Sequence, residues 1–167
     1  MIVGLAPGLR GANRTGRPFT GDFAGDLLYR TLVTYGFAAG SYAAHAGDGL
    51  LLRRARITNA VRCVPPQNKP ETTEIAACRR FLAADLAALP GPRAILALGA
   101  IAHHAVLAAK ELRRARYPFA HAAMHELPDG ILLADSYHCS RLNTNTGRLT
   151  PAMFETVIAA LAERLAA

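Results

Sequence analysis

Short apolar runs alternate with longer helical segments along this chain, and this alternation is the feature that most limits its fold. The strands are expected at residues 1–6, 57–63, 94–98 and 131–135, and the helices at residues 22–36, 72–89, 100–113 and 150–167. Residues 119–127 are either a short strand or an extended connection. Parallel strands need crossover connections, and the helices of these crossovers cover the faces of the sheet. The pattern therefore predicts an α/β fold with a mostly parallel sheet covered on both faces.

The length of 167 residues fits one domain, residues 1–167, that is large enough to bury a core. No apolar run approaches the roughly 20 residues that span a bilayer, and the first residues lack the pattern of a secretion signal. We therefore expect a cytoplasmic monomer with no membrane partner. A central strand that starts at Met1 leaves no room for a leading element, so we also expect that an upstream segment is missing.

The chain is basic, with 19 Lys and Arg against 12 Asp and Glu and a formal net charge of +7. Two interpretations are open. The basic surface is either simply solvated, or it meets a partner that carries phosphates, which the planar donor fork of arginine fits. Charge alone does not choose between them.

Residues 6–22 form a long connection rich in Gly, Pro, Asn and Thr. Connections in compact domains usually run to about 4–6 residues, and much longer ones are commonly functional or disordered. This one holds four glycines, two prolines and Phe19, a composition that predicts a shaped loop. Ligands of open α/β sheets bind beyond the carboxyl ends of the strands. Because the loop follows the first strand, we expect it to form the floor of an active site.

The candidate site residues lie in this loop and in the loops after two other strands. Asp22 can cap the following helix, and it can also orient or deprotonate a water molecule, because the two roles are compatible. Phe19 either fills the core or stacks on a planar ring, and Asn59 either pairs with backbone or recognises an imide edge that offers both a donor and an acceptor. His138 lies among hydroxyls and amides, where it can donate a hydrogen bond to an oxygen that gains negative charge. The other five histidines are interpreted as structural.

Cys63, Cys78 and Cys139 are an odd number of cysteines without the spacing of secreted disulfides. Tetrahedral metal sites and iron–sulfur clusters need four ligands, so the spacing of Cys63 and Cys78 alone favours two unrelated buried thiols. The chain also lacks the fingerprints of a P-loop, of a G-x-G-x-x-G dinucleotide site and of a G-x-S-x-G nucleophile elbow.

Three segments together resemble the type b, or family 5, branch of the uracil-DNA glycosylase superfamily. The first, within residues 4–22, is Gly-Leu-Ala-Pro-Gly followed by Asn-Arg-Thr-Gly-Arg-Pro-Phe-Thr-Gly-Asp. The second, residues 58–70, is Thr-Asn-Ala-Val-Arg-Cys-Val-Pro-Pro-Gln-Asn-Lys-Pro, followed by Glu74 and Cys78. The third, residues 135–150, begins Asp-Ser-Tyr-His-Cys-Ser. The resemblance covers the chain from end to end, with the three motifs in order.

The resemblance implies a three-layer α/β/α sandwich with a four-stranded, mostly parallel sheet. It implies an enzyme that flips uracil, and other deaminated bases such as hypoxanthine, out of DNA and hydrolyses the N-glycosidic bond to leave an abasic site. By position, Asp22 would orient the water and His138 would stabilise the leaving base. Phe19 would stack on that base, and Asn59 would recognise its edge. Further contacts are implied to the base from Gly4, Ala6, Pro7 and Ser140, and to DNA from Arg14, Arg17, Arg141, Leu142, Asn143 and Arg148.

The resemblance also implies a 4Fe–4S cluster held by four cysteines, of which Cys63 and Cys78 match the downstream pair. The upstream pair has no match in this chain. Either the native protein is longer or this chain has lost the cluster, and we expect the first. Cys139 stands where the family commonly has Pro.

Two rival functions stay open at the level of the sequence. One is a truncated, catalytically impaired member of the family that binds damaged or single-stranded DNA without excision. The other is a Rossmann-like nucleotide enzyme whose opening loop holds a phosphate, although the phosphate fingerprints are absent. Release of a base from uracil-containing DNA excludes the first rival, and protection by a free nucleotide but not by DNA would identify the second.

Overall fold

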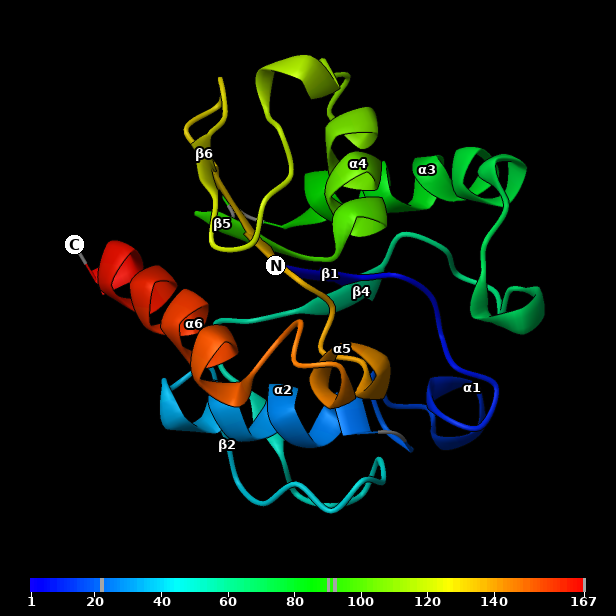
Figure 1. Cartoon of the computed structure of the whole chain (residues 1–167), viewed down its shortest axis with the longest axis vertical. Helices are drawn as coiled ribbons and strands as arrows, with labels where there is room; N and C mark the ends of the chain where they lie inside the picture. The colour runs from blue at the N-terminus through cyan, green and yellow to red at the C-terminus, as the bar shows by residue number, and fades with distance from the viewer. Residues whose placement is uncertain (22, 90, 92, 167) are drawn as a thin grey trace. The chain divides into compact units, whose positions relative to one another are not determined.

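A computed structural model describes residues 1–21, 23–89, 91 and 93–166 of the chain (Figure 1). Two compact units make up the structure. Unit 1 consists of Met1–Ala6 and Ile57–Ser136, and unit 2 consists of Pro7–Arg56 and Tyr137–Ala167. The single domain expected over residues 1–167 stays a prediction.

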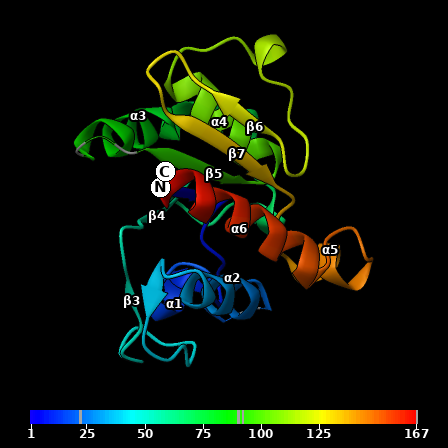
Figure 2. The same cartoon turned by 90° about the vertical axis from the view of Figure 1, so that its left-hand side faces the viewer.

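Unit 1 contains a five-stranded sheet in the order β4-β1-β5-β7-β6. Its strands are β1 (Ile2–Gly4), β4 (Ile57–Asn59), β5 (Ala94–Leu98), β6 (Met124–Glu126) and β7 (Leu132–Ser136). The first four strands in this order are parallel, and β6 pairs antiparallel with β7 (Figure 2). The α/β fold with a mainly parallel sheet is therefore confirmed. The sheet has one strand more than the expected four, because the short turn at Gly130 lets β6 fold back on β7 without a crossover.

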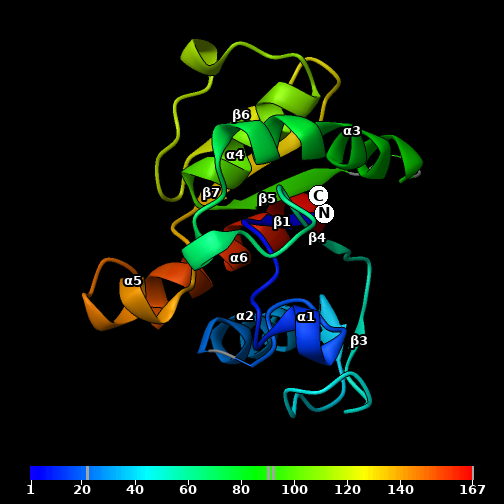
Figure 3. The same ribbon diagram turned by 90° about the vertical axis from the view of Figure 1, so that its right-hand side faces the viewer.

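The helices of unit 1 follow the strands as the sequence predicts. They are the 3₁₀ turns η1 (Pro66–Asn68) and η2 (Arg114–Arg116) and the α-helices α3 (Thr72–Ala88) and α4 (Ala100–Ala109). A capping box starts α3, in which the Glu74 carboxylate accepts a hydrogen bond of 2.7 Å from the backbone N–H of Glu71. The helices α3 and α4 lie side by side along the sheet (Figure 3).

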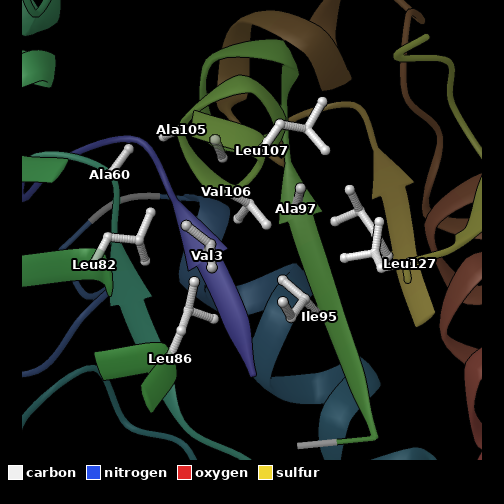
Figure 4. Close-up of a cluster of buried hydrophobic side chains, with 12 residues drawn as sticks. Val3, Ala60, Leu82, Leu86, Ile95, Ala97, Ala105, Val106, Leu107 and Leu127 are labelled. Atoms are coloured by element: carbon white, nitrogen blue, oxygen red, sulfur yellow. The ribbon is translucent and has the colours of Figure 1, made fainter. Parts of the chain in front are cut away.

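The core of unit 1 lies between these two helices and the central strands. Val3 of β1 and Ile95 of β5 face Leu82 of α3 and Val106 of α4, all at most 1% exposed (Figure 4). Burial of a side chain of this size contributes about 1.5–3 kcal/mol. This apolar layer holds the strand ends in place.

The carboxyl ends of the parallel strands lie at one edge of the sheet. In the register, Gly4 of β1 pairs with Asn59 of β4, and Leu98 of β5 pairs with Ser136 of β7. The chain leaves unit 1 at this edge after Ala6 and again after Ser136. The polar loops after β1 and β7 therefore start from the same edge of the sheet.

Unit 2 is mainly helical. Its elements are α1 (Ala12–Thr15), α2 (Phe23–Thr34), a hairpin of β2 (Ala38–Ala39) and β3 (Leu51–Leu52), α5 (Arg141–Asn145) and α6 (Pro151–Ala166). The longer helices α2 and α6 contact each other. Gly36, with φ of 75°, ends α2, and Thr150 caps α6, which has Pro151 at its first position. Within the described ranges, no helix is long and apolar enough to cross a membrane.

Candidate active site

The opening loop in unit 2 is folded onto itself. The backbone N–H of Gly11 donates to the carbonyl of Gly8 at 3.1 Å, and the hydroxyl of Thr20 donates to the carbonyl of Arg17 at 2.7 Å. The hydroxyls of Thr15 and Thr20 also share a hydrogen bond. The loop therefore has the defined shape that its composition predicts.

Phe19 is held in a backbone conformation that is unusual for a bulky residue, with φ of 59°. Its half-buried ring lies 5.9 Å from the ring of His138, centroid to centroid, with an interplanar angle of 31°. The structure of unit 2 thus brings together the aromatic residue and the histidine that the sequence selects from two distant loops.

Arg17 connects the opening loop to the segment of residues 42–50. Its guanidinium donates to the Asp48 carboxylate and to the carbonyls of Ala46 and Leu50, at 3.0 and 3.2 Å for the two carbonyls. Burial opposes ionisation of Asp48, but hydrogen bonds from backbone N–H groups and from Arg17 outweigh it and hold the pKa of Asp48 below its usual value. These donors of Arg17 are used inside the protein, and its role with DNA stays a prediction.

The loop after β7 continues into the short helix α5. The Asn143 side chain donates to the carbonyl of His138 at 2.8 Å, which holds the backbone of the histidine. Ser140 caps α5 by accepting from the backbone N–H of Asn143 at 3.4 Å. Leu142 is 72% exposed, an uncommon position for a large apolar side chain. Arg148 lies over the ring of Tyr137, 4.7 Å from its centroid.

In unit 1, Asn59 lies at the end of β4 beside the end of β1. The backbone N–H of Ala60 donates to the carbonyl of Gly4 at 2.9 Å, and that of Val61 donates to the carbonyl of Leu5 at 3.0 Å. The side-chain oxygen of Asn59 is buried and has no hydrogen-bond partner among the described residues. A buried amide oxygen without a partner is costly, and it marks a place where a ligand donor would fit.

The middle motif is attached to α3. The Arg62 guanidinium forms an ion pair of 2.5 Å with Asp85, and the backbone N–H of Arg62 donates to the sulfur of Cys78 at 3.5 Å. Cys63, next in the chain, is exposed, whereas Cys78 is buried. The two predicted cluster ligands thus belong to adjoining segments of unit 1. Among the residues that the structure describes, no group of three or more Cys, His, Asp or Glu side chains is arranged to hold a metal ion.

One buried polar pair in unit 1 has no counterpart in the sequence analysis. Nδ1 of His103 lies 2.7 Å from Oδ1 of Asp135, and Nε2 of His103 lies 2.8 Å from the carbonyl of Tyr117. His103 and Asp135 are both fully buried. A carbonyl oxygen can only accept a hydrogen bond, so Nε2 of His103 is the donor to Tyr117.

The predicted site residues fall into three groups. In unit 2, Phe19, His138, Ser140 and Asn143 are joined by ring and hydrogen-bond contacts. In unit 1, Gly4 and Asn59 are neighbours across two strands, with Ala6 two residues beyond Gly4. The remaining predicted residues are Pro7, Arg14, Arg17, Cys63, Cys78, Arg141, Leu142 and Arg148, together with Asp22, which lies outside the described residues. Arg14, Cys63, Arg141, Leu142 and Arg148 are exposed.

Comparisons with known proteins agree with this architecture. Residues 1–162 match the uracil DNA glycosylase superfamily. The chain is 48% identical over 158 residues to a type-5 uracil-DNA glycosylase of Thermus thermophilus, covering 95% of this chain and 72% of that protein. It is 43% identical to a type-5 uracil-DNA glycosylase of Mycobacterium leprae, covering 94% of this chain and 69% of the relative. The identity to a type-5 uracil-DNA glycosylase of Pyrobaculum aerophilum is also 43%, over 90% of this chain and 65% of the relative. The chain belongs to the uracil DNA glycosylase superfamily.

Proposed function

We propose that the protein is a monofunctional uracil-DNA glycosylase that excises uracil from DNA in the cytoplasm as a monomer. Its similarity to three type-5 uracil-DNA glycosylases supports the reaction. The observation in the structure that carries the proposal is the placement of the Phe19 ring beside His138 in a loop with a strained backbone. An aromatic ring can stack on a flipped base, and a neighbouring hydrogen-bond donor can bind one of its oxygens.

The reaction begins with a base that is unreachable inside a duplex. The enzyme must rotate the nucleotide out of the helix, at a cost of a few kcal/mol. The bond between C1′ and N1 then breaks, its electron pair leaves with the base, and the oxygen of water bonds to C1′. One proton of the water ends on the base, so the products are free uracil and an abasic site.

In unit 2, we assign to Phe19 the stacking on the flipped base, and to His138 the stabilisation of the leaving base. Stacking of a base on an aromatic side chain is worth about 1–3 kcal/mol and tolerates different bases, so hypoxanthine is a second expected substrate. His138 would donate a hydrogen bond to the oxygen on which negative charge develops. From the resemblance, Asp22 would orient the attacking water.

In unit 1, we assign recognition of the base edge to Asn59. Uracil offers an N–H donor between two carbonyl acceptors, and the buried Oδ1 of Asn59 is an acceptor without a described partner. Cytosine has no N–H at that ring position and has an amino group in place of the neighbouring carbonyl, so it would not match both the acceptor and the donor of the Asn59 amide as uracil does. Gly4, Ala6, Pro7 and Ser140 are proposed as further contacts to the base.

The DNA backbone is proposed to meet the exposed basic residues. Arg14, Arg141 and Arg148 are exposed. Leu142 on α5 is also exposed, and we propose that it fills the gap that the flipped base leaves in the DNA helix. Arg17 and Asn143 complete the proposed DNA contacts.

Cys63 and Cys78 are proposed as cluster ligands, but the chain does not fit a complete 4Fe–4S site. Such a cluster needs four cysteine thiolates, and this sequence has three cysteines. No step of the reaction above depends on the cluster. Iron and sulfide analysis of the purified protein, with Cys63→Ser as the comparison, tests whether the pair binds iron at all.

A glycosylase assay on a labelled duplex with one uracil, followed by alkaline cleavage of abasic sites, tests the function. Wild type should release uracil, and His138→Ala should excise it about 10²–10³-fold more slowly, because one donor to the developing negative charge is lost. His45→Ala, which changes an exposed histidine of the same unit, should match wild type. Binding of uracil-containing DNA without any release by wild type would instead identify the impaired DNA-binding protein.

A further inference from the structure

We propose that Tyr29 and Tyr42 are positioning residues that hold Phe19 in the conformation in which its ring receives the base. This inference rests on the proposed function, because it assigns a purpose to the backbone of Phe19. Both tyrosines belong to unit 2 and lie outside the three motifs of the sequence. Together they are called the tyrosine clamp.

The clamp binds two consecutive carbonyl groups of the opening loop. The hydroxyl of Tyr29 donates to the carbonyl of Pro18 at 2.6 Å, and the hydroxyl of Tyr42 donates to the carbonyl of Phe19 at 3.3 Å. Burial raises the pKa of Tyr29, so its hydroxyl stays protonated as a donor. A positive φ at a residue with a side chain costs roughly 1–3 kcal/mol, and it persists only where surrounding contacts impose it. The two hydrogen bonds are contacts of this kind.

The two tyrosines also support each other. Their rings are stacked with centroids 4.7 Å apart, and the Arg17 guanidinium lies 5.9 Å from the centroid of the Tyr29 ring. Arg17 in turn binds Asp48, six residues after Tyr42. The clamp therefore joins α2, the opening loop and the segment of residues 42–50.

Gly25 on α2 leaves the space in which the Tyr42 hydroxyl meets the Phe19 carbonyl. A Cβ atom at this position would lie 1.8 Å from the carbonyl oxygen of Phe19 and 2.3 Å from the hydroxyl of Tyr42. Both atoms would have to move, so the loop lies against the helix only because residue 25 has no side chain. The Phe19 carbonyl that Tyr42 binds therefore lies directly against the backbone of α2 at Gly25.

The position of the Phe19 backbone decides where its ring lies relative to His138. The two rings are 5.9 Å apart. A loop released from the clamp can relax to a common backbone conformation, and the ring then leaves His138. Neither tyrosine is assigned a contact with the base, so each acts through Phe19.

A double-mutant cycle tests this dependence. Tyr42→Phe keeps the ring stack and removes one hydroxyl, and single-turnover excision of uracil should slow about 2- to 10-fold, which corresponds to one neutral hydrogen bond. Phe19→Ala should slow excision about 5- to 150-fold. If Tyr42 acts through Phe19, Tyr42→Phe has no further effect in the Phe19→Ala background. Tyr35→Phe, at the end of α2, is the matched control and should excise at the wild-type rate.

Equal effects of Tyr42→Phe in both backgrounds would overturn the proposal, because they would show that the hydroxyl acts independently of Phe19. Hydrogen–deuterium exchange gives a second measurement that does not require activity. The backbone amides of residues 19–21 should exchange faster in Tyr42→Phe than in wild type, and unchanged exchange would also overturn the clamp. If wild type releases no uracil, the proposed function fails, and this exchange measurement alone decides whether the clamp exists.

Discussion

The Asn59 side chain lowers the stability of the folded protein in the absence of a ligand. The buried side-chain oxygen of Asn59 accepts no hydrogen bond from the described residues. Leaving such an acceptor unpaired costs about 1–3 kcal/mol. Groups of this kind are retained where a ligand supplies the missing partner, and the N–H of a uracil ring is such a donor.

Asn59→Ala is therefore expected to separate stability from activity. The free energy of unfolding should stay the same or rise, because the unpaired oxygen is removed, whereas kcat/KM for uracil DNA should fall about 10²-fold or more. Denaturant unfolding and the excision assay measure the two effects.

Thr58→Ala is the contrasting variant, because the Thr58 hydroxyl does have a partner in Asp85 at 2.8 Å. It should lower stability and leave excision near wild type. A clear loss of stability in Asn59→Ala would assign Asn59 a structural role.

The pair of His103 and Asp135 gives a second prediction at this scale. His103→Ala would leave the fully buried Asp135 carboxyl without its partner, and removal of one member of such a pair costs about 3–5 kcal/mol. We expect a loss of this size in the free energy of unfolding by urea. His104→Ala, one position along α4, should cost much less because His104 is only partly buried. Similar losses in the two variants would show that the contact between His103 and Asp135 contributes no special stability.

At the scale of elements, the irregular segment of residues 42–50 has a structural task. It supplies Asp48 and Tyr42, which bind Arg17 and the carbonyl of Phe19. A short segment with little regular structure can hold a shape only through such contacts. The shape of the opening loop therefore depends on the segment of residues 42–50 that contacts it.

This support should depend on pH in a defined direction. Because the folded pKa of Asp48 lies below its unfolded value of about 3.9, its contribution to stability is complete above that value and is lost as the pH falls through the folded pKa. Asp48→Asn should therefore melt at a lower temperature than wild type at pH 7 and at pH 5, and the difference should shrink at pH 3. Thermal unfolding at the three values measures it, with the exposed Glu163→Gln as control. A difference that is constant across this range would exclude the ionised carboxylate as its cause.

At the scale of the whole molecule, the net charge of +7 favours a polyanionic partner. The affinity for duplex DNA should fall steeply with salt, because each arginine that neutralises a phosphate releases counterions. Arg141→Ala and Arg148→Ala should each reduce the slope of log K against log salt by about 1. Arg164→Ala, exposed near the end of α6, is the control and should not change the slope. A slope that neither variant changes would place the phosphates elsewhere on the protein.

Local signals in the sequence were enough to predict most elements. The apolar run of residues 94–98 forms the central strand β5. Gly36, with its positive φ, follows the end of α2, and Pro151 is the first residue of α6, as the backbone preferences of glycine and proline predict. The strand β6 was not predicted as a partner of β7. The pairing of β6 with β7 depends on the turn between them and on the position of β7 in the sheet. A strand of only three residues is too short for its hydrophobic pattern to indicate either.

The sequence by itself determined the parallel α/β arrangement and the motifs that define the family. It also identified Phe19, Asn59 and His138 as candidate site residues. Their residue types follow from the chemistry that each can perform, and periodicity is a local property that the order of residues records directly. Only the tertiary structure decided that the rings of Phe19 and His138 are neighbours, that the oxygen of Asn59 has no partner among the described residues, and that Arg17 binds Asp48. It also revealed the tyrosine clamp. These facts concern partners far apart in the chain, and packing, rather than any local preference, selects which of many possible partners meet.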